Sequence, residues 1–215
     1  WIKAGPKAPV TAEPLDFTGW PGERAARRLR FIGELVVTPK GVGAMEPFRV
    51  HPFQREIITG AYAEGIRTAL VSLPRANGKT ALAAALAVAE LFSGPASAEV
   101  LVVASDERQA RIALNMARRM IEINPELAER AQIYADKIVV PHNDATMIAL
   151  PADPAALHGW DPSLLIVDEL HVVTEGVWEA VTSVSGKRPE SLVLAISTPS
   201  TTPDSIMWRL VEHGR

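Results

Sequence analysis

Continuous apolar runs alternate with helical patterns along most of the chain. Runs at 68–73, 99–105, 164–167 and 191–198 are typical of strands that are buried on both faces of a parallel sheet. The segments between them, 81–92, 106–123 and 177–185, have the apolar spacing or composition of helices. Two shorter runs, 133–140 and 146–150, flank a turn and predict a hairpin. Strands that alternate with helices predict an α/β fold with a mostly parallel central sheet.

The amino-terminal part follows a different pattern. Residues 1–20 are rich in turn residues and predict an extended arm, and residues 23–37 have helical spacing. The other faces of this helix carry Arg24, Arg27, Arg28 and Arg30. A solvated face is the favoured explanation of these arginines, and a contact with DNA or a partner is the alternative. We therefore expect an arm and basic helix over 1–45 and one domain over 46–215.

Composition narrows the class of protein. The 215 residues are 47% apolar, enough to bury a full core, and the net charge of −3 means that any DNA contact needs a local basic patch. The chain has no cysteine, which excludes disulfides and thiolate metal sites. Apolar runs stay shorter than about 18 residues, so no membrane span is expected. A start without Met and an abrupt end at residue 215 indicate a fragment of a longer protein.

The most informative stretch is 73–80, Leu-Pro-Arg-Ala-Asn-Gly-Lys-Thr, between a predicted strand and a predicted helix. The amino end of a helix suits phosphate because its backbone N–H groups are free. In a phosphate loop, Lys79 would reach the β- and γ-phosphates and Thr80 would hold Mg²⁺. The usual pattern has glycine where this chain has Leu73, so a simple turn at Asn77-Gly78 remains an alternative. The predicted nucleotide-binding residues here are Pro74, Arg75, Ala76, Asn77, Gly78, Lys79 and Thr80.

Two more strand ends carry candidate chemistry. The run 164–167 is followed by Asp168 and Glu169, and ligands of open parallel sheets bind at the carboxyl ends of strands. Asp168 is the expected Mg²⁺ partner, and Glu169 is placed to orient or deprotonate the attacking water. A strand end with a helix cap is the alternative for this acid pair. The run 191–198 leads into Ser197, Thr198 and Pro199, which could contact the γ-phosphate or the catalytic water.

Gln54 follows Pro52 at the start of another predicted helix. Its amide can donate and accept a hydrogen bond at once, which suits the edge of adenine. We favour this binding role over that of an ordinary helical glutamine because of the motifs downstream.

The order of Gln54, the loop 74–80, Asp168-Glu169 and Ser197-Thr198-Pro199 resembles the ATPase domain of the large terminase subunit of tailed bacteriophages, over about residues 45–200. Terminase loops lack the first glycine and carry an early arginine, as Arg75 does here. The resemblance implies a RecA-like P-loop NTPase of the ASCE type that uses ATP and Mg²⁺. It also implies a motor that drives double-stranded viral DNA into a preformed capsid.

The resemblance further implies partners: double-stranded DNA, the portal protein and procapsid, the small terminase subunit, and copies of the chain in a ring, expected to be a pentamer. The setting would be the host cytoplasm. In such rings a neighbour's arginine completes the site. Arg188 matches by position and Lys187 is the less suitable candidate, with a plain surface turn as the alternative. Arg75 would be a phosphate ligand in cis or a switch. The nuclease domain of whole terminases does not fit in this chain, so we expect no DNA cleavage and slow hydrolysis by the isolated domain.

Two rival functions remain. Asp168-Glu-Leu-His171 spells the D-E-x-H box of a helicase group, so the chain could be half of a helicase. His171 is then expected to begin a helix rather than to couple motifs. The second rival is a DNA- or capsid-binding adaptor that binds nucleotide without turnover, which the intact Lys79 and Glu169 argue against.

Overall fold

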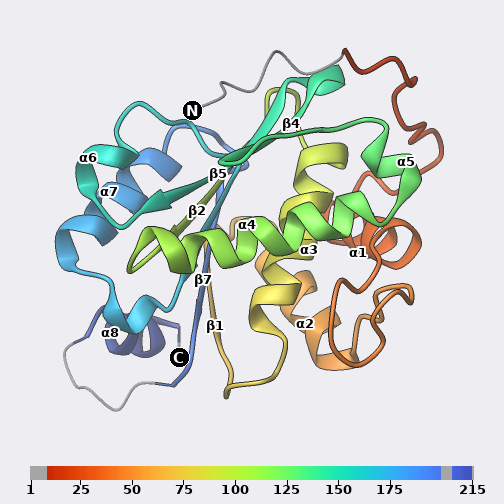
Figure 1. Cartoon of the computed structure of the whole chain (residues 1–215). Coiled ribbons are helices and arrows are strands. Elements are labelled where there is room, and N and C mark those ends of the chain that lie inside the picture. The colour runs from red at the N-terminus through yellow and green to blue at the C-terminus, as the bar shows by residue number, and fades with distance from the viewer. Residues whose placement is uncertain (1–8, 200–204, 215) are drawn as a thin grey trace.

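The computed structural model describes residues 9–199 and 205–214, and a seven-stranded sheet organises them (Figure 1). The strand order is β1-β7-β6-β2-β5-β4-β3. Neighbours from β1 to β5 in this order pair in parallel, and β5, β4 and β3 pair antiparallel. The strands are β1 (Thr68–Ser72), β2 (Glu99–Ala104), β3 (Gln132–Ile133), β4 (Lys137–Val140), β5 (Ala145–Pro151), β6 (Leu164–Asp168) and β7 (Leu192–Ser197). The predicted mostly parallel α/β sheet is confirmed.

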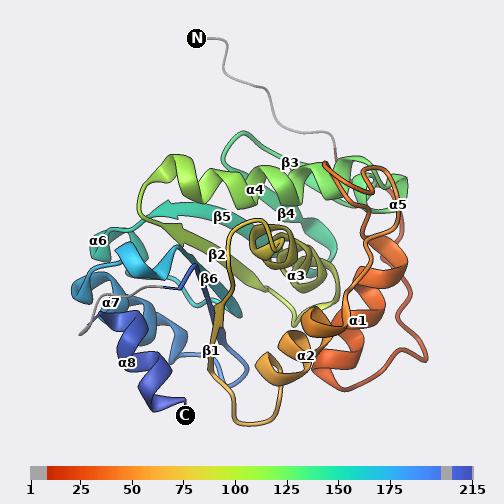
Figure 2. The same cartoon turned by 90° about the horizontal axis from the view of Figure 1, so that it is seen from below.

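Helices cover both faces of the sheet (Figure 2). One face carries α1 (Arg24–Leu35), α2 (Pro52–Ala61), α3 (Lys79–Ser93), α4 (Glu107–Glu122) and α5 (Pro125–Ala128), and the other carries α6 (Pro154–Leu157), α7 (Glu175–Ser185) and α8 (Ile206–His213). Two 3₁₀ turns, η1 (Pro141–Asn143) and η2 (Leu170–Val172), complete the structure. The strands divide their side chains between two cores: Val100 and Val102 point to one, and Leu101 and Val103 to the other. This alternation across a doubly covered sheet explains the continuous apolar runs.

The helix α3 lies at the centre of the first face. Every residue from 82 to 93 is buried, so this helix has no solvent face beyond its first turn. Its many alanines let the sheet, α1 and α4 approach closely on different sides. The loop that precedes α3 is therefore attached to a helix that is buried over most of its length.

The predicted strand over 133–140 is wrong in one respect. It is two short strands, β3 and β4, that pair antiparallel with each other. Tyr134 donates its backbone N–H to the carbonyl of Lys137, which closes a turn inside the apolar run. The hairpin between β4 and β5 forms as expected, with Asp144 in the left-handed conformation at φ 56°.

The helix α1 joins the core of the domain that follows it. Phe31 and Ile32 are fully buried there, and α1 packs on α3. The solvated face expected for its arginines is wrong for Arg28, which is 3% exposed and donates to the Glu90 carboxylate and to the carbonyl of Ser93. A helical pattern cannot reveal this because the counter-charge comes from α3. The domain boundary at residue 45 stays a prediction.

Among the described helices, none has both the length and the apolar character needed to cross a membrane.

Candidate active site

The phosphate-loop candidate leaves β1 and enters α3, at the lower end of the sheet in Figure 1. Two of its residues have left-handed backbone, Ala76 at φ 65° and Gly78 at φ 70°. Glycine adopts this conformation without strain, whereas alanine pays about 1–2 kcal/mol. Gly78 directly precedes the helix, and a Cβ added there would meet the Gln54 amide nitrogen at 3.7 Å. The loop is therefore a tight, partly strained turn that ends at a helix amino terminus.

Two side chains of the loop hold its shape. The Lys79 ammonium donates to the carbonyl oxygens of Leu73 at 2.7 Å and Pro74 at 2.8 Å. The Asn77 amide donates to the carbonyl oxygens of Pro74 and Arg75 at 3.2 and 3.3 Å. The ammonium consequently lies within the curve of the loop, where a bound phosphate would meet it. Thr80 follows in the first turn of α3 and is half-buried.

The acid pair lies at the carboxyl end of β6, two strands from β1 in the sheet. Burial raises the pKa of the Asp168 carboxyl above its usual range, and Lys79 and His171 act on it in the opposite direction. The pairing of the strands brings the two loops together: Asp168 is opposite Ile196, and the next residue, Ser197, accepts the backbone N–H of Leu73 at the start of the loop that carries Lys79. Glu169 has left-handed backbone at φ 55°, an uncommon conformation for a side chain of its size.

Ser197, the last residue of β7, connects the two loops. It is fully buried, and its carbonyl accepts the backbone N–H of Leu73 at 3.1 Å. Its hydroxyl lies 3.0 Å from Nδ1 of His171, in the turn after Glu169. We expected His171 only to begin a helix. The structure places it in the short turn η2 and adds this contact with Ser197. Thr198 is half-buried and Pro199 exposed beyond the strand end.

Gln54 lies beside the loop, with part of its amide already engaged. It is 4% exposed, and its Oε1 accepts the backbone N–H of His51 at 3.0 Å, which caps α2. Next to it is a cavity of about 780 Å³ between the loop 38–49, the start of α2 and residues 76–78. The stacked rings of His51 and Phe53 lie at its edge. While this cap persists, Gln54 has its Nε2 group and the second lone pair of Oε1 left for a contact with adenine.

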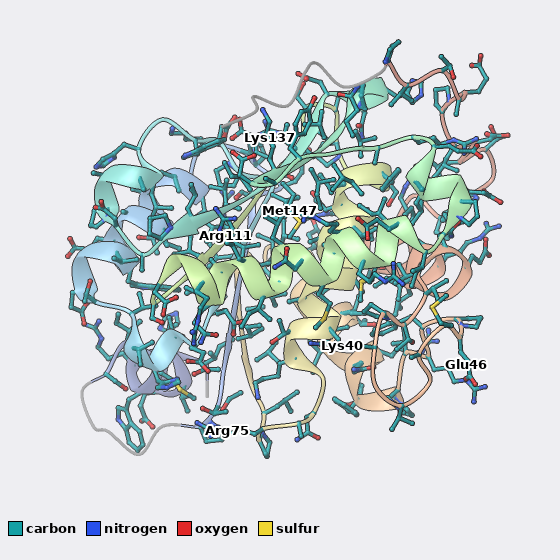
Figure 3. All side chains as sticks on the ribbon, viewed as in Figure 1. Lys40, Glu46, Arg75, Arg111, Lys137 and Met147 are labelled. Atoms are coloured by element: carbon teal, nitrogen blue, oxygen red, sulfur yellow. The ribbon has the colours of Figure 1, made fainter. Side chains whose placement is uncertain are left out.

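The two predicted arginines lie in different places. Arg75 is exposed on the phosphate loop, at the lower edge of Figure 3. Arg188 lies in the turn between α7 and β7, at the amino end of β7 and so at the opposite edge of the sheet from Ser197. Its guanidinium donates to Asp161 at 3.0 Å and to the carbonyl of Ser97 at 2.8 Å, and neighbouring Lys187 donates to the carbonyl of Trp160 at 2.6 Å. Within one subunit, Arg188 is not part of the site.

The oxygen ligands at this site suit the way in which phosphate-loop proteins bind Mg²⁺. Within 9–199 and 205–214 there is no group of three or more His, Asp or Glu side chains arranged to hold an ion. Mg²⁺ in phosphate-loop proteins needs only a hydroxyl and one carboxylate, since water and substrate phosphates supply the other ligands. Thr80 and Asp168 meet that requirement.

Comparison with known proteins bears on this geometry directly. The family model for the ATPase domain of the terminase large subunit matches residues 52–213. The chain belongs to this family. The large terminase subunit of Enterobacteria phage HK97 is 30% identical over 193 residues, which cover 86% of this chain and 38% of that protein. Its crystal structure matches with a TM-score of 0.80 at 28% identity, over 89% of this chain and 41% of that one. The chain thus spans about two fifths of the length of these HK97 relatives.

More distant structures share the fold. The ATPase domain of the Thermus phage P74-26 large terminase matches with a TM-score of 0.56 at 22% identity, over 72% of each chain. The UvsW helicase from bacteriophage T4 matches with a TM-score of 0.57 at 10% identity, over 86% of this chain and 63% of that chain. These neighbours confirm the predicted RecA-like fold, and the family assignment confirms that the chain is a terminase ATPase domain.

Proposed function

We propose that this chain is the motor domain that hydrolyses ATP to drive double-stranded DNA into a viral capsid. The observation that carries the proposal is that the loop with Lys79 and the acid pair lie at the same end of the sheet: Leu73, at the start of the loop, bonds to the carbonyl of Ser197, and Asp168 pairs with Ile196 in the neighbouring register position. A cation that binds phosphate and a carboxylate that binds Mg²⁺ are recurring parts of phosphoryl-transfer sites. Family membership supplies the packaging context.

In this proposal the loop 74–80 binds the phosphates of ATP. The Lys79 ammonium exchanges its bonds to Leu73 and Pro74 for the β- and γ-phosphate oxygens. The amino end of α3 adds backbone N–H groups. Thr80 and Asp168 hold Mg²⁺, which when bound neutralises charge on the phosphates. Arg75, exposed on the same loop, adds a further cation in cis.

Glu169 is the proposed catalytic base. It orients a water for attack on the γ-phosphorus and accepts its proton while the bond to the β–γ bridging oxygen breaks. Ser197, Thr198 and Pro199 lie at the end of the strand beside Asp168 and so are the proposed coupling segment. We expect release of the cleaved phosphate to change the contacts of this segment first.

The cavity beside the loop is the proposed site of the base and ribose. Its position against 76–78 continues from the phosphate site. Gln54 would donate from Nε2 to an adenine nitrogen, and the rings of His51 and Phe53 offer an apolar surface at the rim.

The proposed partners are double-stranded DNA, the portal protein with the procapsid, the small terminase subunit, and further copies of the chain in a ring, in the host cytoplasm.

Arg188 acts on a neighbour's site in this proposal only if it leaves Asp161 and Ser97. Mixing Arg188→Ala subunits with Glu169→Ala subunits tests this, because a trans finger gives partial rescue of hydrolysis. Lys187→Ala, the less suitable candidate, is tested in the same way. The trans role of Arg188 is refuted if Arg188→Ala subunits alone hydrolyse ATP at the wild-type rate, or if their mixture with Glu169→Ala subunits hydrolyses no faster than the two variants measured separately.

The function itself is tested by ATP hydrolysis with double-stranded DNA and procapsids. Removing a general base costs about 10²- to 10⁴-fold in rate, so Glu169→Gln should lose at least the lower figure. Glu179→Gln, an exposed glutamate on α7, should keep the wild-type rate. A wild-type rate no higher than that of Glu169→Gln, with nucleotide still bound, would establish the adaptor without turnover instead.

A further inference from the structure

Ser197 lies where three functional segments meet. Its carbonyl holds Leu73, the residue that opens the phosphate loop, and its hydroxyl contacts His171, two residues after Glu169. Ser197 itself is the last residue of β7, directly before Thr198. One fully buried residue thus links the loop for the phosphates, through its carbonyl, to the turn with the proposed base, through its hydroxyl, at the start of the proposed coupling segment.

Two backbone hydrogen bonds and one buried side chain also restrain the turn that carries His171. Its own hydrogen bonds run from Val172 N–H to the carbonyl of Glu169 at 3.0 Å and from Val173 N–H to the carbonyl of Leu170 at 3.1 Å. Leu170 is 1% exposed and belongs to the apolar core beneath α7 and α8. The apolar anchor at Leu170 and the bond between His171 and Ser197 therefore fix two adjacent residues of one short turn.

The left-handed backbone of Glu169 makes the position of its carboxylate depend on these contacts. Its left-handed conformation is unfavourable for a residue with a long side chain, so the surrounding contacts must hold it in place. The polar member of those contacts is His171, whose Nδ1 either donates to the serine hydroxyl or accepts from it. Losing the bond frees the turn to relax and moves the Glu169 carboxylate away from its required place.

We propose that His171 is a positioning residue that ties the Glu169 turn to the end of β7 through Ser197. Resting on the proposed ATP hydrolysis, this assigns to one hydrogen bond the transfer of movement between the coupling segment and the base. A misplacement of a catalytic group by about 1 Å costs about 10²-fold in rate. His171→Ala should accordingly lower kcat by about 10- to 100-fold while nucleotide affinity changes less than about 3-fold.

The experiment measures kcat for ATP, with double-stranded DNA present, and the dissociation constant of a fluorescent ATP analogue. The variants are His171→Ala, Ser197→Ala, their double variant and His171→Asn. The asparagine amide reaches the position of Nδ1 and should restore kcat to within about 3-fold of wild type. If both residues act through one bond, the double variant is no slower than the slower single variant. The control is His213→Ala, an exposed histidine at the end of α8, which should leave kcat unchanged.

Three results overturn the proposal: His171→Ala with wild-type kcat, a double variant that shows the product of both losses, or a loss confined to nucleotide affinity. Thermal melts identify a variant that does not fold. In that case Ser197→Ala and His171→Asn still decide, because the first must be slow and the second must be fast. Failure of the proposed function is distinct, since wild type would then hydrolyse no faster than Glu169→Gln.

Discussion

The buried ion pair between α1 and α3 allows a quantitative prediction. The Arg28 guanidinium donates to the Glu90 carboxylate through Nε, at 3.0 Å, and through a terminal nitrogen. The two side chains are 3% and 1% exposed. Burial acts to lower the pKa of Arg28, but the interactions with Glu90 and Tyr62 together raise that pKa above its usual value. The Arg28 guanidinium therefore stays charged, and the prediction concerns Glu90→Leu.

The cost follows from the bonds that are lost. Two hydrogen bonds to a charged group are worth about 1.5–3 kcal/mol each, and breaking one partner of a buried pair costs about 3–5 kcal/mol in other proteins. Arg28 keeps its bonds to Ser93, to the carbonyl at 3.1 Å and to the hydroxyl at 3.4 Å, which favours the lower part of that range. Burial raises the pKa of the Tyr62 hydroxyl to about 12, so this neighbour stays neutral at pH 7 and cannot replace the lost charge. We expect Glu90→Leu to lower the free energy of unfolding by about 3–4 kcal/mol.

Urea denaturation at pH 7 measures this change. With a slope of about 2–3 kcal/mol per molar urea, the midpoint should fall by about 1–2 M. The double variant Arg28→Met/Glu90→Leu should return to within about 1 kcal/mol of wild type, since it buries no unpaired charge. The control is Arg30→Met/Glu34→Leu, an exposed pair on α1, with an expected change below about 1 kcal/mol. The reasoning is refuted if Glu90→Leu costs less than the control, or if the double variant is as unstable as Glu90→Leu.

Two further predictions concern the active-site loops. Ala76→Gly should raise the free energy of unfolding by about 1 kcal/mol, since glycine adopts φ 65° without strain. Ala81→Gly, within α3, should instead lower the free energy of unfolding by about 1 kcal/mol. Equal effects of the two variants in urea denaturation would contradict this. Asp168→Asn should abolish hydrolysis yet raise the melting temperature at pH 7. The raised pKa of Asp168 means that the folded state binds its proton more tightly than the unfolded state, so stability falls as pH rises from 3.8 through that raised pKa. The gain of the variant should disappear as pH falls toward 3.8, whereas exposed Asp136→Asn should show no such trend.

Much of the fold and the centre of the site follow from the sequence for a simple reason. Continuous apolar runs specify buried parallel strands, and parallel strands bring their carboxyl ends to one edge. Asp168 and Ser197 end their strands, and Lys79 lies at the end of the loop that leaves β1, so their convergence could be predicted without knowing the strand order.

The remaining features depend on partners that are distant in sequence. Arg28 has the same pattern as its exposed neighbours, and only the packing of α3 supplies Glu90. The bond of Arg188 to Asp161 likewise needs the approach of two loops. Gln54 shows a third limit, because a residue at a helix start can serve its own backbone before it serves a ligand.

The burial of α3 determines how its amide hydrogens exchange with solvent. A helix buried from residue 82 to residue 93 can exchange its amide hydrogens only when much of the domain opens. The exposed residues 74–78 lie immediately before it and can exchange through local opening. Protection against deuterium should therefore rise steeply over a single turn, between Asn77 and Leu82. Lys79 and Thr80 lie on that boundary, at the junction between an exposed loop and a buried helix.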